Sequence, residues 1–527
     1  MLPVVHIYID RSEAETWNHD EIDNLQGKIN TGEYSMSKVI IIGGGAAGMM
    51  AGVFVARNHH EVHILEKNEK LGKKVFITGK GRCNVTNACD TEELFPAMMS
   101  NPKFLYSSFY SFTPQDVMEF FEKAGVPLKV ERGNRVFPQS DHSSDIIRAL
   151  ERELKKAGAK IHLHTAVQEI VKKPVTESVT DSVNTLESEA ALTESGSDAG
   201  KGRKGKKSPD IPQEKIAGVI LTDGTFMEGD AVIVATGGFS YQSTGSTGDG
   251  YRFARELGLK VTDIAPSLVP LKTKEDYIPK LQGLSLKNTG LTIKNGKKVL
   301  YEDFGEMMFT HFGVTGPMIL SASAHIGAKL AKAPNGELSA YLDLKPALTR
   351  EQLDARILRE FEAGPNKQFK NVIGVLFPSS LTPVMLELGG IPAEKKIHDI
   401  SREERQHFIE LIKAFPFTIT GMGEFKEAII TRGGVSVKEI NPGTMESKKI
   451  SGLYFAGEVL AVSYTHLTIP DLHGCRCHDR LRSADRKPDQ LPDGCCGTAW
   501  YLCSLLPCNL SWIQRKSSSS YLHYWWC

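Results

Sequence analysis

The stretch KVIIIGGGAAGMMAGVFVAR, which runs from Lys38 to Arg57, decides the fold of this chain. Its first residues are mostly β-branched and predict a buried strand, and the small residues after the glycines predict a helix. Gly43, Gly45 and Gly48 form the pattern G-x-G-x-x-G. In this pattern the first glycine makes a tight turn, the second lets the backbone approach a pyrophosphate, and the third lets helix and strand pack closely. We therefore expect an α/β fold built on a Rossmann-like dinucleotide-binding domain.

An acidic residue at the end of the next strand supports the same interpretation. The strand EVHILEK reaches Glu66, close to the spacing of about 20 residues at which a carboxylate accepts hydrogen bonds from ribose hydroxyls. Two later segments, VIVATGGFS (residues 232–240) and GLYFAGEVL (residues 452–460), resemble the returns by which flavoproteins of the two-dinucleotide-binding type wrap FAD. An NAD-dependent dehydrogenase does not need them. FAD is therefore the expected ligand.

Length and composition set the broad class of the protein. A chain of 527 residues exceeds one hydrophobic core, so two or three domains are expected. Hydrophobic content of 41%, charged content of 24% and a formal net charge of zero are typical of a soluble globular protein. This charge balance does not favour nucleic acid or an anionic membrane as a partner. No run approaches the roughly 20 apolar residues of a membrane span, and we expect a cytoplasmic protein.

Pattern and composition also predict the domain boundaries. Thr349 and Ser401 stand three residues before Gln352 and Glu404, the spacing of helix-capping boxes, in a stretch of helical periodicity. Short alternating apolar runs before that stretch predict a β-rich module, and a segment rich in Ser, Thr, Glu, Gly and Lys predicts a disordered insertion at a hairpin tip. The expected parts are an upstream extension (1–36), an FAD-binding domain (37–242 and 420–461) with the insertion (174–214), the β-rich module (243–345 and 414–428), a helical module (346–413) and a tail (462–527).

Several long motifs identify a family. The segments FITGKGRCNVTN, TGSTGDGYRFARELG, FGEMMFTHFGVTGPMIL and TRGGVSVKEINPGTMESKKISGLYFAGEVL occur in this order. With them the chain resembles the BaiN/RdsA-type family of NAD(P)/FAD-dependent oxidoreductases, also called aminoacetone-oxidase-like flavoproteins, from Ser37 to Leu460. The resemblance implies an FAD-binding Rossmann-like domain that is interrupted by a β-barrel-like module and a helical module.

The resemblance also implies the residues that bind FAD. The pyrophosphate would be held by Gly43, Gly45, Ala46, Ala47 and Gly48, and the adenosine ribose by Glu66. The flavin side would be approached by Gly79 and Gly81 and hydrogen-bonded by Arg82, Asn84, Thr86 and Asn87. The adenine would meet the backbone of Val167, and the cofactor would be bounded by Thr236, Gly237, Gly457 and Glu458.

Two residues are weak candidates for a catalytic role, and the catalytic residues otherwise stay unknown. Cys83 stands beside Arg82, which could lower the pKa of its thiol, but it lacks a C-x-x-C partner because Cys89 lies six residues on. A small packed residue near the flavin is the favoured interpretation. His311 could donate a proton to a substrate carbonyl or enolate, although a loop histidine bonded to backbone is favoured. The chain has no G-x-S-x-G elbow, so hydrolase chemistry has no support.

The expected reaction is hydride transfer through flavin N5 between NAD(P)H or oxygen and a small organic substrate. Only one dinucleotide fingerprint is present, so NAD(P)H would bind transiently. One alternative is a flavin-dependent RNA-modifying enzyme, which would need a basic face and would show salt-sensitive RNA retention. Another is a non-catalytic or defective flavin-binding chain, which would retain FAD without turnover.

The composition changes after Leu460. In family members an acidic residue, a glycine-rich turn and a closing helix follow at this point, whereas this chain continues AVSYTHLTIPDLHGCRCHDR. The hexapeptide VSYTHL (462–467) resembles a translated transposon end used in sequencing libraries, and seven of the nine cysteines follow it. We expect residues 462–527 to be a non-native tail and the closing helix to be missing. A divergent native tail or a zinc site at CRCH (475–478) are alternatives, but its cysteine spacing matches no standard zinc pair. No metal is expected.

Overall fold

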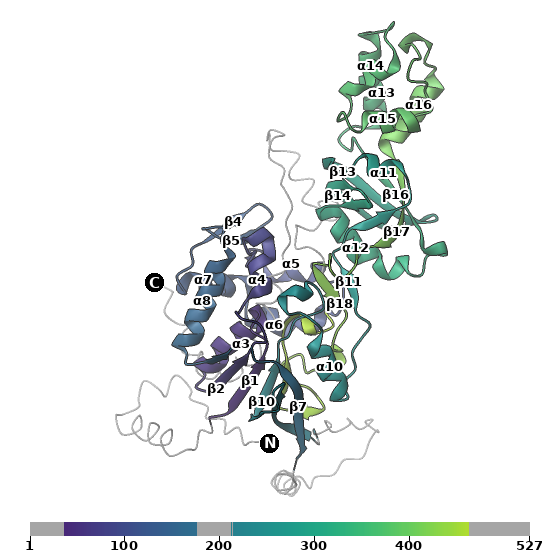
Figure 1. Ribbon diagram of the computed structural model, residues 1–527. Helices are drawn as coiled ribbons and strands as arrows, with labels where there is room; N and C mark the ends of the chain where they lie inside the picture. Colours follow the sequence, from purple (N-terminus) through teal and green to yellow (C-terminus); the bar gives the residue numbers. More distant parts are fainter. Residues whose placement is uncertain (1–35, 176–211, 213, 463–527) are drawn as a thin grey trace, which may run out of the picture.

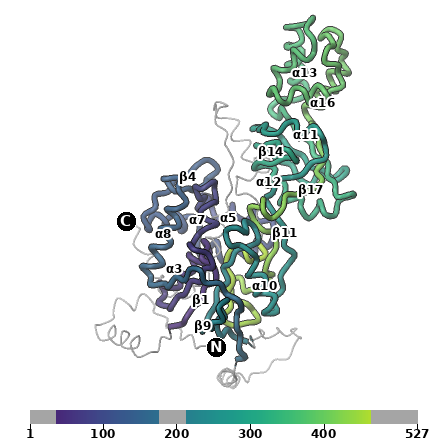
Figure 2. Tube along the Cα trace, in the orientation of Figure 1, coloured from purple at the N-terminus to yellow at the C-terminus, as the bar shows by residue number. Residues whose placement is uncertain are grey.

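The computed structural model describes residues 36–175, 212 and 214–462, which form three units in a row (Figure 1). A Rossmann-type α/β unit is followed by a closed β-barrel, and a group of helices caps the far end of the barrel. Figure 2 shows the chain leaving the first unit in teal and returning to it in light green, so the barrel and helices interrupt the α/β unit. The expected fold class is confirmed. None of the described helices is long and apolar enough to cross a membrane.

The first unit is built on a five-stranded parallel sheet. Its central strand is almost entirely buried, as parallel strands covered by helices are. Helix α3 (Ala46–Arg57) follows that strand and packs beside α8 (Ser143–Lys156). The strands, in spatial order, are β20 (Leu453–Phe455), β10 (Ala231–Val234), β1 (Lys38–Ile42), β2 (Glu61–Leu65) and β6 (Lys160–His162).

Smaller sheets surround this core. Strand β7 (Val167–Pro174) pairs antiparallel with β8 (Glu214–Leu221), and Pro174 lies opposite Glu214. The expected hairpin is therefore present, while residues 176–211 and 213 of the expected insertion (174–214) lie outside the described residues. The other elements are β9 (Phe226–Glu228), β19 (Ile450–Ser451), the sheet β3 (Thr86–Asn87), β5 (Arg135–Pro138) and β4 (Leu128–Glu131), and helices α4 (Lys73–Ile77), α5 (Thr91–Leu94), α6 (Tyr106–Ser111), α7 (Pro114–Lys123) and α10 (Asp249–Glu256).

The barrel begins later in the chain than the sequence predicted. We expected the β-rich module to start at residue 243, but α10 buries Tyr251 and Phe253 in the core of the first unit. The first barrel strand begins only at Leu271. The boundary was misplaced because the apolar face of α10 packs on the Rossmann sheet, a contact between distant segments. Strand β11 (Ala265–Ser267) pairs with β18 (Ile430–Arg432) where the chain passes between the units.

The barrel closes around its own apolar core. Alternate residues of its strands, such as Leu291 and Ile293, are fully buried, as the period of two in a strand requires. Helix α12 (Pro317–Leu330) covers β14. The strands, in order around the barrel, are β12 (Leu271–Thr273), β15 (Gly313–Thr315), β14 (Lys298–Thr310), β13 (Ser285–Asn295), β16 (Leu338–Asp343) and β17 (Phe415–Met422), and the short helix α11 (Tyr277–Lys280) follows β12.

The helical unit confirms both predicted capping boxes. The Thr349 side chain accepts a hydrogen bond from the backbone N–H of Gln352, and Ser401 does the same for Glu404. These caps satisfy amides that have no partner within the helix. The helices are α13 (Arg350–Glu362), α14 (Phe369–Val372), α15 (Thr382–Leu388) and α16 (Arg402–Lys413).

A histidine pair at the edge of the Rossmann sheet predicts a pH dependence of stability. His63 on β2 and His162 on β6 lie with Nδ1 and Nε2 3.0 Å apart. Burial and the neighbouring His63 lower the pKa of His162 below 6.5. The unfolded chain therefore binds a proton here more readily than the folded chain, so the free energy of unfolding is expected to fall as pH drops below about 6.5.

The His162→Gln variant should show a shallower loss of stability between pH 7.5 and 5.5 in urea unfolding. The matched control is His407→Gln, because His407 is exposed on α16. Equal pH slopes for His162→Gln and the unsubstituted chain would contradict the prediction.

Candidate cofactor-binding site

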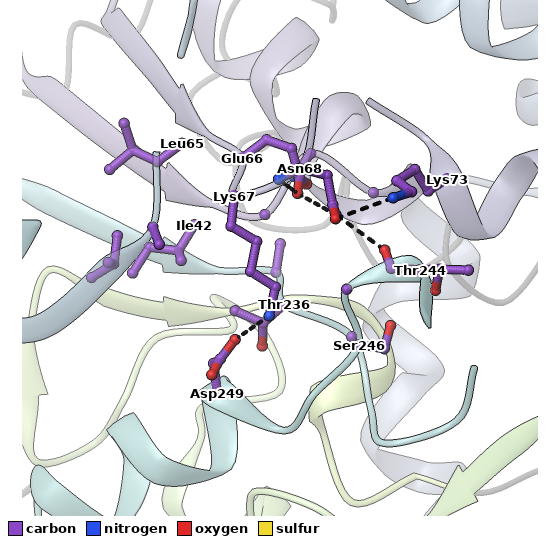
Figure 3. A pocket seen from close by; sticks show the side chains of 18 of the residues that line it. Ile42, Leu65, Glu66, Lys67, Asn68, Lys73, Thr236, Thr244, Ser246 and Asp249 are labelled. Carbon is purple, nitrogen blue, oxygen red and sulfur yellow. Dashed lines mark hydrogen bonds and ion pairs between the residues drawn. The ribbon is translucent and has the colours of Figure 1, made fainter. Parts of the chain in front are cut away.

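A cavity of about 340 Å³ lies at the carboxyl ends of β1, β2 and β10. Figure 3 shows side chains from these strand ends turned toward one space. In open parallel sheets this edge is where ligands bind. The lining includes segments 42–47, 65–68, 72–75, 165–168, 235–237 and 244–246, together with Thr222, Asp249, Arg252, Phe253 and Glu458.

The three fingerprint glycines lie where their expected roles require. Gly43 has φ +107°, and a Cβ there would approach the Ala235 carbonyl oxygen to 2.6 Å. A Cβ on Gly48 would lie 1.8 Å from the Gly43 carbonyl oxygen. Only a glycine at position 48 therefore lets α3 pack this closely against the turn. Gly45 lines the cavity, and a Cβ on it would meet nothing within 4 Å. A ligand in the cavity can therefore approach the backbone at Gly45, the second glycine of the pattern.

Helix α3 begins at the wall of this cavity. Ala46 and Ala47 occupy its first turn and line the cavity, and this turn has no acidic side chain. The first amides of a helix lack intrahelical acceptors and carry partial positive charge. An unblocked helix start beside a glycine turn suits a phosphate group.

Glu66 offers a fixed carboxylate beside the glycine turn. Its Oε2 accepts a hydrogen bond from the Gly44 amide at 2.8 Å. Its Oε1 accepts from the Asn68 amide at 2.8 Å and from Asn68 Nδ2 at 2.7 Å. Asn68 Nδ2 also donates to the Thr244 carbonyl oxygen at 3.1 Å, as Figure 3 shows. These bonds hold the carboxylate in place, where it can accept further bonds from sugar hydroxyls.

A buried ion pair at the same cavity joins an early segment of the Rossmann unit to the segment that returns to it at the end of the chain's described part. Lys74 Nζ lies 2.6 Å from Glu458 Oε2, and both side chains are almost fully buried. Glu458 Oε1 accepts from the Thr431 amide at 2.8 Å and from Ser240 Oγ at 3.1 Å. Segments from α4, from β18 and from the loop after β10 are thereby tied to the turn at residues 457–459.

The structure brings about half of the predicted cofactor residues to the cavity. Lining it are Gly43, Gly45, Ala46, Ala47, Glu66, Val167, Thr236, Gly237 and Glu458. Gly48 instead packs α3 against the turn. Outside the lining lie Gly79, Gly81, Arg82, Asn84, Thr86, Asn87 and Gly457. The flavin-side role of these residues stays a prediction.

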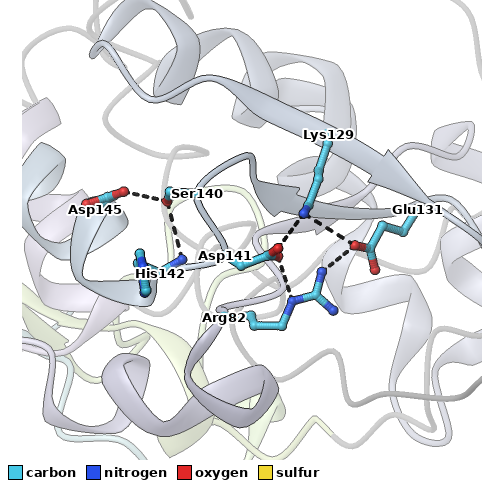
Figure 4. Close-up of polar contacts among 7 residues, drawn as sticks. All are labelled: Arg82, Lys129, Glu131, Ser140, Asp141, His142 and Asp145. Atoms are coloured by element: carbon cyan, nitrogen blue, oxygen red, sulfur yellow. Dashed lines mark hydrogen bonds and ion pairs between the residues drawn. The ribbon is translucent and has the colours of Figure 1, made fainter.

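Arg82 is bound by charged residues that do not line the cavity. Its Nε donates to Asp141 Oδ1 at 2.7 Å, and its guanidinium also bonds to Glu131 (Figure 4). Lys129 Nζ lies 2.6 Å from Asp141 Oδ2. The guanidinium carbon stands 4.1 Å from the centroid of the Phe137 ring. These contacts anchor the loop to strands β4 and β5.

Sequence reasoning missed several lining residues that carry charge or hydrogen bonds. Lys67 Nζ lies 2.6 Å from Asp249 Oδ2 and closes one edge of the cavity (Figure 3). Lys67 and Asn68 directly follow Glu66, so their position at the strand end could have indicated them. Lys74 carried no signal in the sequence, because its partner Glu458 is 384 residues away.

Neither catalytic candidate lines the cavity. Cys83 is buried, and burial raises the pKa of its thiol to about 12. This agrees with the favoured interpretation of Cys83 as a packed residue. His311 is exposed in the turn between β14 and β15, where its ring contacts Phe312. Within the described ranges no group of three or more His, Cys, Asp or Glu residues could hold a metal ion, and the CRCH segment lies outside those ranges.

Burial predicts slow alkylation of Cys83. Because the thiolate is the nucleophile, iodoacetamide at pH 8 should leave Cys83 unmodified in the native protein and modify it after urea unfolding. Peptide mass spectrometry separates this thiol from those of the tail. Full alkylation of Cys83 within minutes in the native protein would contradict its burial.

The fold and site define a Rossmann-type dinucleotide-binding protein interrupted by a barrel and a helical unit. Family models described as the HI0933-like protein Rossmann domain and the HI0933-like protein barrel and H2TH domain match residues 37–201 and 265–430. The chain belongs to this HI0933-like family of flavoprotein oxidoreductases, which confirms the resemblance seen in the motifs. Membership of this family supports FAD as the cofactor.

Two curated relatives are similar to this chain over most of its length. The 3-dehydro-bile acid delta(4,6)-reductase of Clostridium scindens is 29% identical over 81% of this chain and 93% of its own length. The ribosomal RNA dihydrouridine synthase of Haemophilus influenzae is 28% identical over 81% of this chain and 93% of its own length. The solved 3-ketosteroid delta1-dehydrogenase of Sterolibacterium denitrificans aligns over 92% of this chain and 100% of its own, with 12% identity and a TM-score of 0.43.

Proposed function

We propose that the protein is an FAD-dependent oxidoreductase that acts on a small organic substrate in the cytoplasm, with NAD(P)H or oxygen as the second reactant. The observation that carries the proposal is the cavity at the sheet edge, where a glycine turn, a helix start and a fixed carboxylate meet. FAD, when bound, supplies hydride transfer at flavin N5. The reduced nicotinamide would bind transiently, because the sequence has one dinucleotide fingerprint.

The residues of the cavity fit the adenosine diphosphate part of FAD. The first turn of α3 would bind the diphosphate and Glu66 the ribose. Thr236 lines the cavity, and its buried Oγ1 has no hydrogen-bond partner among the described residues. A buried hydroxyl without a partner costs free energy, so a cofactor that bonds to it would be stabilised. Val167 also lines the cavity, and its backbone would meet the adenine.

Two measurements test the proposal. FAD added to the purified full chain should lose fluorescence on binding, and the bound flavin should bleach with NADPH or NADH under anaerobic conditions. The Glu66→Gln variant should bind FAD more weakly, since a neutral amide bonds less strongly than a carboxylate. Absence of FAD uptake would overturn the proposal. FAD uptake without turnover of any small organic substrate, with either nicotinamide nucleotide or oxygen as the second reactant, would support a non-catalytic flavin-binding protein.

A second candidate is a flavin-dependent RNA-modifying enzyme. Two curated relatives, from Haemophilus influenzae and Escherichia coli, are named ribosomal RNA dihydrouridine synthases and are 28% and 26% identical. The equal numbers of basic and acidic residues, 63 each, favour a small molecule instead. Incubation with ribosomal RNA and, separately, with a 3-dehydro-bile acid decides between the two substrate classes. Dihydrouridine in the RNA, with salt-sensitive RNA binding, would replace the first candidate.

A further inference from the structure

A second cavity, of about 260 Å³, lies where the barrel meets the helical unit. Figure 1 shows this junction between β13 and the helices above it. Its walls come from the start of β13, from Leu344 and Lys345 after β16, and from residues 376–381 before α15. It shares no residue with the cavity of the Rossmann unit.

The walls of this junction cavity combine six apolar residues with five polar ones, and Lys287 and Lys345 are among the polar ones. The strand pairing of β13 with β14 shifts register between Leu286 and Thr289, and this irregular segment forms one wall. The polar lining groups are neutral or basic, and no carboxylate is among them. The buried apolar lining residues are Leu286, Leu344, Leu376, Phe377 and Leu381.

Two of the cations near this junction, Lys345 and Arg356, have no counter-ion in the part of the chain that the structure describes. Lys345 lines the cavity and is half-buried, and Arg356 on α13 is close enough to add to burial in lowering the pKa of the Lys345 amine. Among the described residues neither side chain has an acidic partner within ion-pair distance. The nearby Asp343 lies 2.6 Å from Lys413 through Oδ2, and its Oδ1 accepts from the backbone amide of Lys345. The Asp343 carboxylate is therefore already engaged.

We propose that the junction cavity binds a small carboxylate with an apolar body, with Lys345 at the carboxylate and the leucine and phenylalanine wall around the body. A bound anion would remove the repulsion between two like charges and compensate their desolvation. The volume is slightly below the roughly 300 to 1,000 Å³ of drug-sized sites. A short-chain or single-ring monocarboxylate fits this size.

Octanoate is a suitable probe, and its binding to the full chain can be followed by calorimetry. Lys345→Met keeps the apolar stem and removes the charge, so affinity is expected to fall roughly tenfold; Arg356→Met should give a smaller loss. Lys298→Met, at an exposed position on β14, is the matched control and should leave the affinity unchanged. Octan-1-ol has the apolar chain without the negative charge, and inorganic phosphate has negative charge without the chain. Each should bind more weakly than octanoate.

A labelling experiment on the unsubstituted chain locates the site, so it does not depend on whether a variant folds. An acetylating reagent near pH 8 should modify Lys345 early, because a larger fraction of its amine is neutral, and octanoate should protect it in peptide mass spectrometry. Unchanged Lys345 labelling at saturating octanoate, or equal affinity of the Lys345→Met variant, would overturn the proposal. Equal protection by phosphate would overturn the apolar part. FAD uptake by Lys345→Met should match that of the unsubstituted chain, since the two cavities are separate.

Discussion

Gly48→Ala is expected to lower the affinity for FAD by about a hundredfold. The added Cβ would lie 1.8 Å from the Gly43 carbonyl oxygen. No rotamer change relieves a clash with backbone, so α3 must move away from the turn. Overpacking of this kind costs roughly 3 kcal/mol at the upper end of its usual range, and that energy equals about two factors of ten in a binding constant. Titration of FAD fluorescence measures the loss.

Two other alanine substitutions separate the role of Gly48 from a general effect of losing a glycine. Gly374→Ala introduces a Cβ into open space in the helical unit and should leave FAD binding unchanged. Gly45→Ala also meets no protein atom within 4 Å, and its φ of −75° suits alanine. It should therefore preserve the fold while weakening FAD binding, because its Cβ enters the cavity. FAD affinity of Gly48→Ala within a factor of three of the unsubstituted chain, on the order of 0.6 kcal/mol, would refute the packing argument.

The parts of the fold that the sequence predicted well depend on local contacts. The strand, glycine turn and helix between Lys38 and Arg57 are specified by residues that touch their neighbours in the chain. The capping boxes at Thr349 and Ser401 need only a side chain and a backbone amide three residues on. The end of the Rossmann unit depends on a distant contact instead, because α10 could pack on the sheet or join the barrel. Periodicity does not decide between these two cores.

Within the candidate site, too, the local contacts could be predicted from the sequence and the contacts between distant residues could not. Glu66 could be predicted because its distance from the glycines reflects the length of one helix and one strand. Arg82 was expected on the flavin side, but its guanidinium is bound by Glu131 and Asp141. Glu131 lies 49 residues and Asp141 59 residues further along the chain, and no sequence pattern pairs them with Arg82. The motif thus predicted the loop that carries Arg82, but it did not predict the direction of the Arg82 side chain.

Lys74→Met should be the most destabilising single substitution at the cavity that leaves the backbone unaltered. It leaves the Glu458 carboxylate buried without its cation, and breaking a buried pair in this way costs about 3 to 5 kcal/mol. The two side chains are only 9% and 4% exposed, so water cannot replace the lost contact. Urea unfolding followed by circular dichroism should show this loss as a lower midpoint for the Rossmann unit.

The neighbouring Lys73→Met variant is the matched control for this ion pair. Lys73 pairs with Glu69 at 3.2 Å, but the Glu69 side chain is half exposed, and an exposed pair of this kind contributes at most about 1 kcal/mol. Adding Glu458→Gln to Lys74→Met should recover part of the stability, because a neutral amide is cheaper to bury than an unpaired carboxylate. The effects of the two substitutions on the free energy of unfolding should then differ from additivity by at least about 1 kcal/mol, as is usual for residues in contact. If Lys74→Met were no less stable than Lys73→Met, the ion pair would not hold the two ends of the Rossmann unit together.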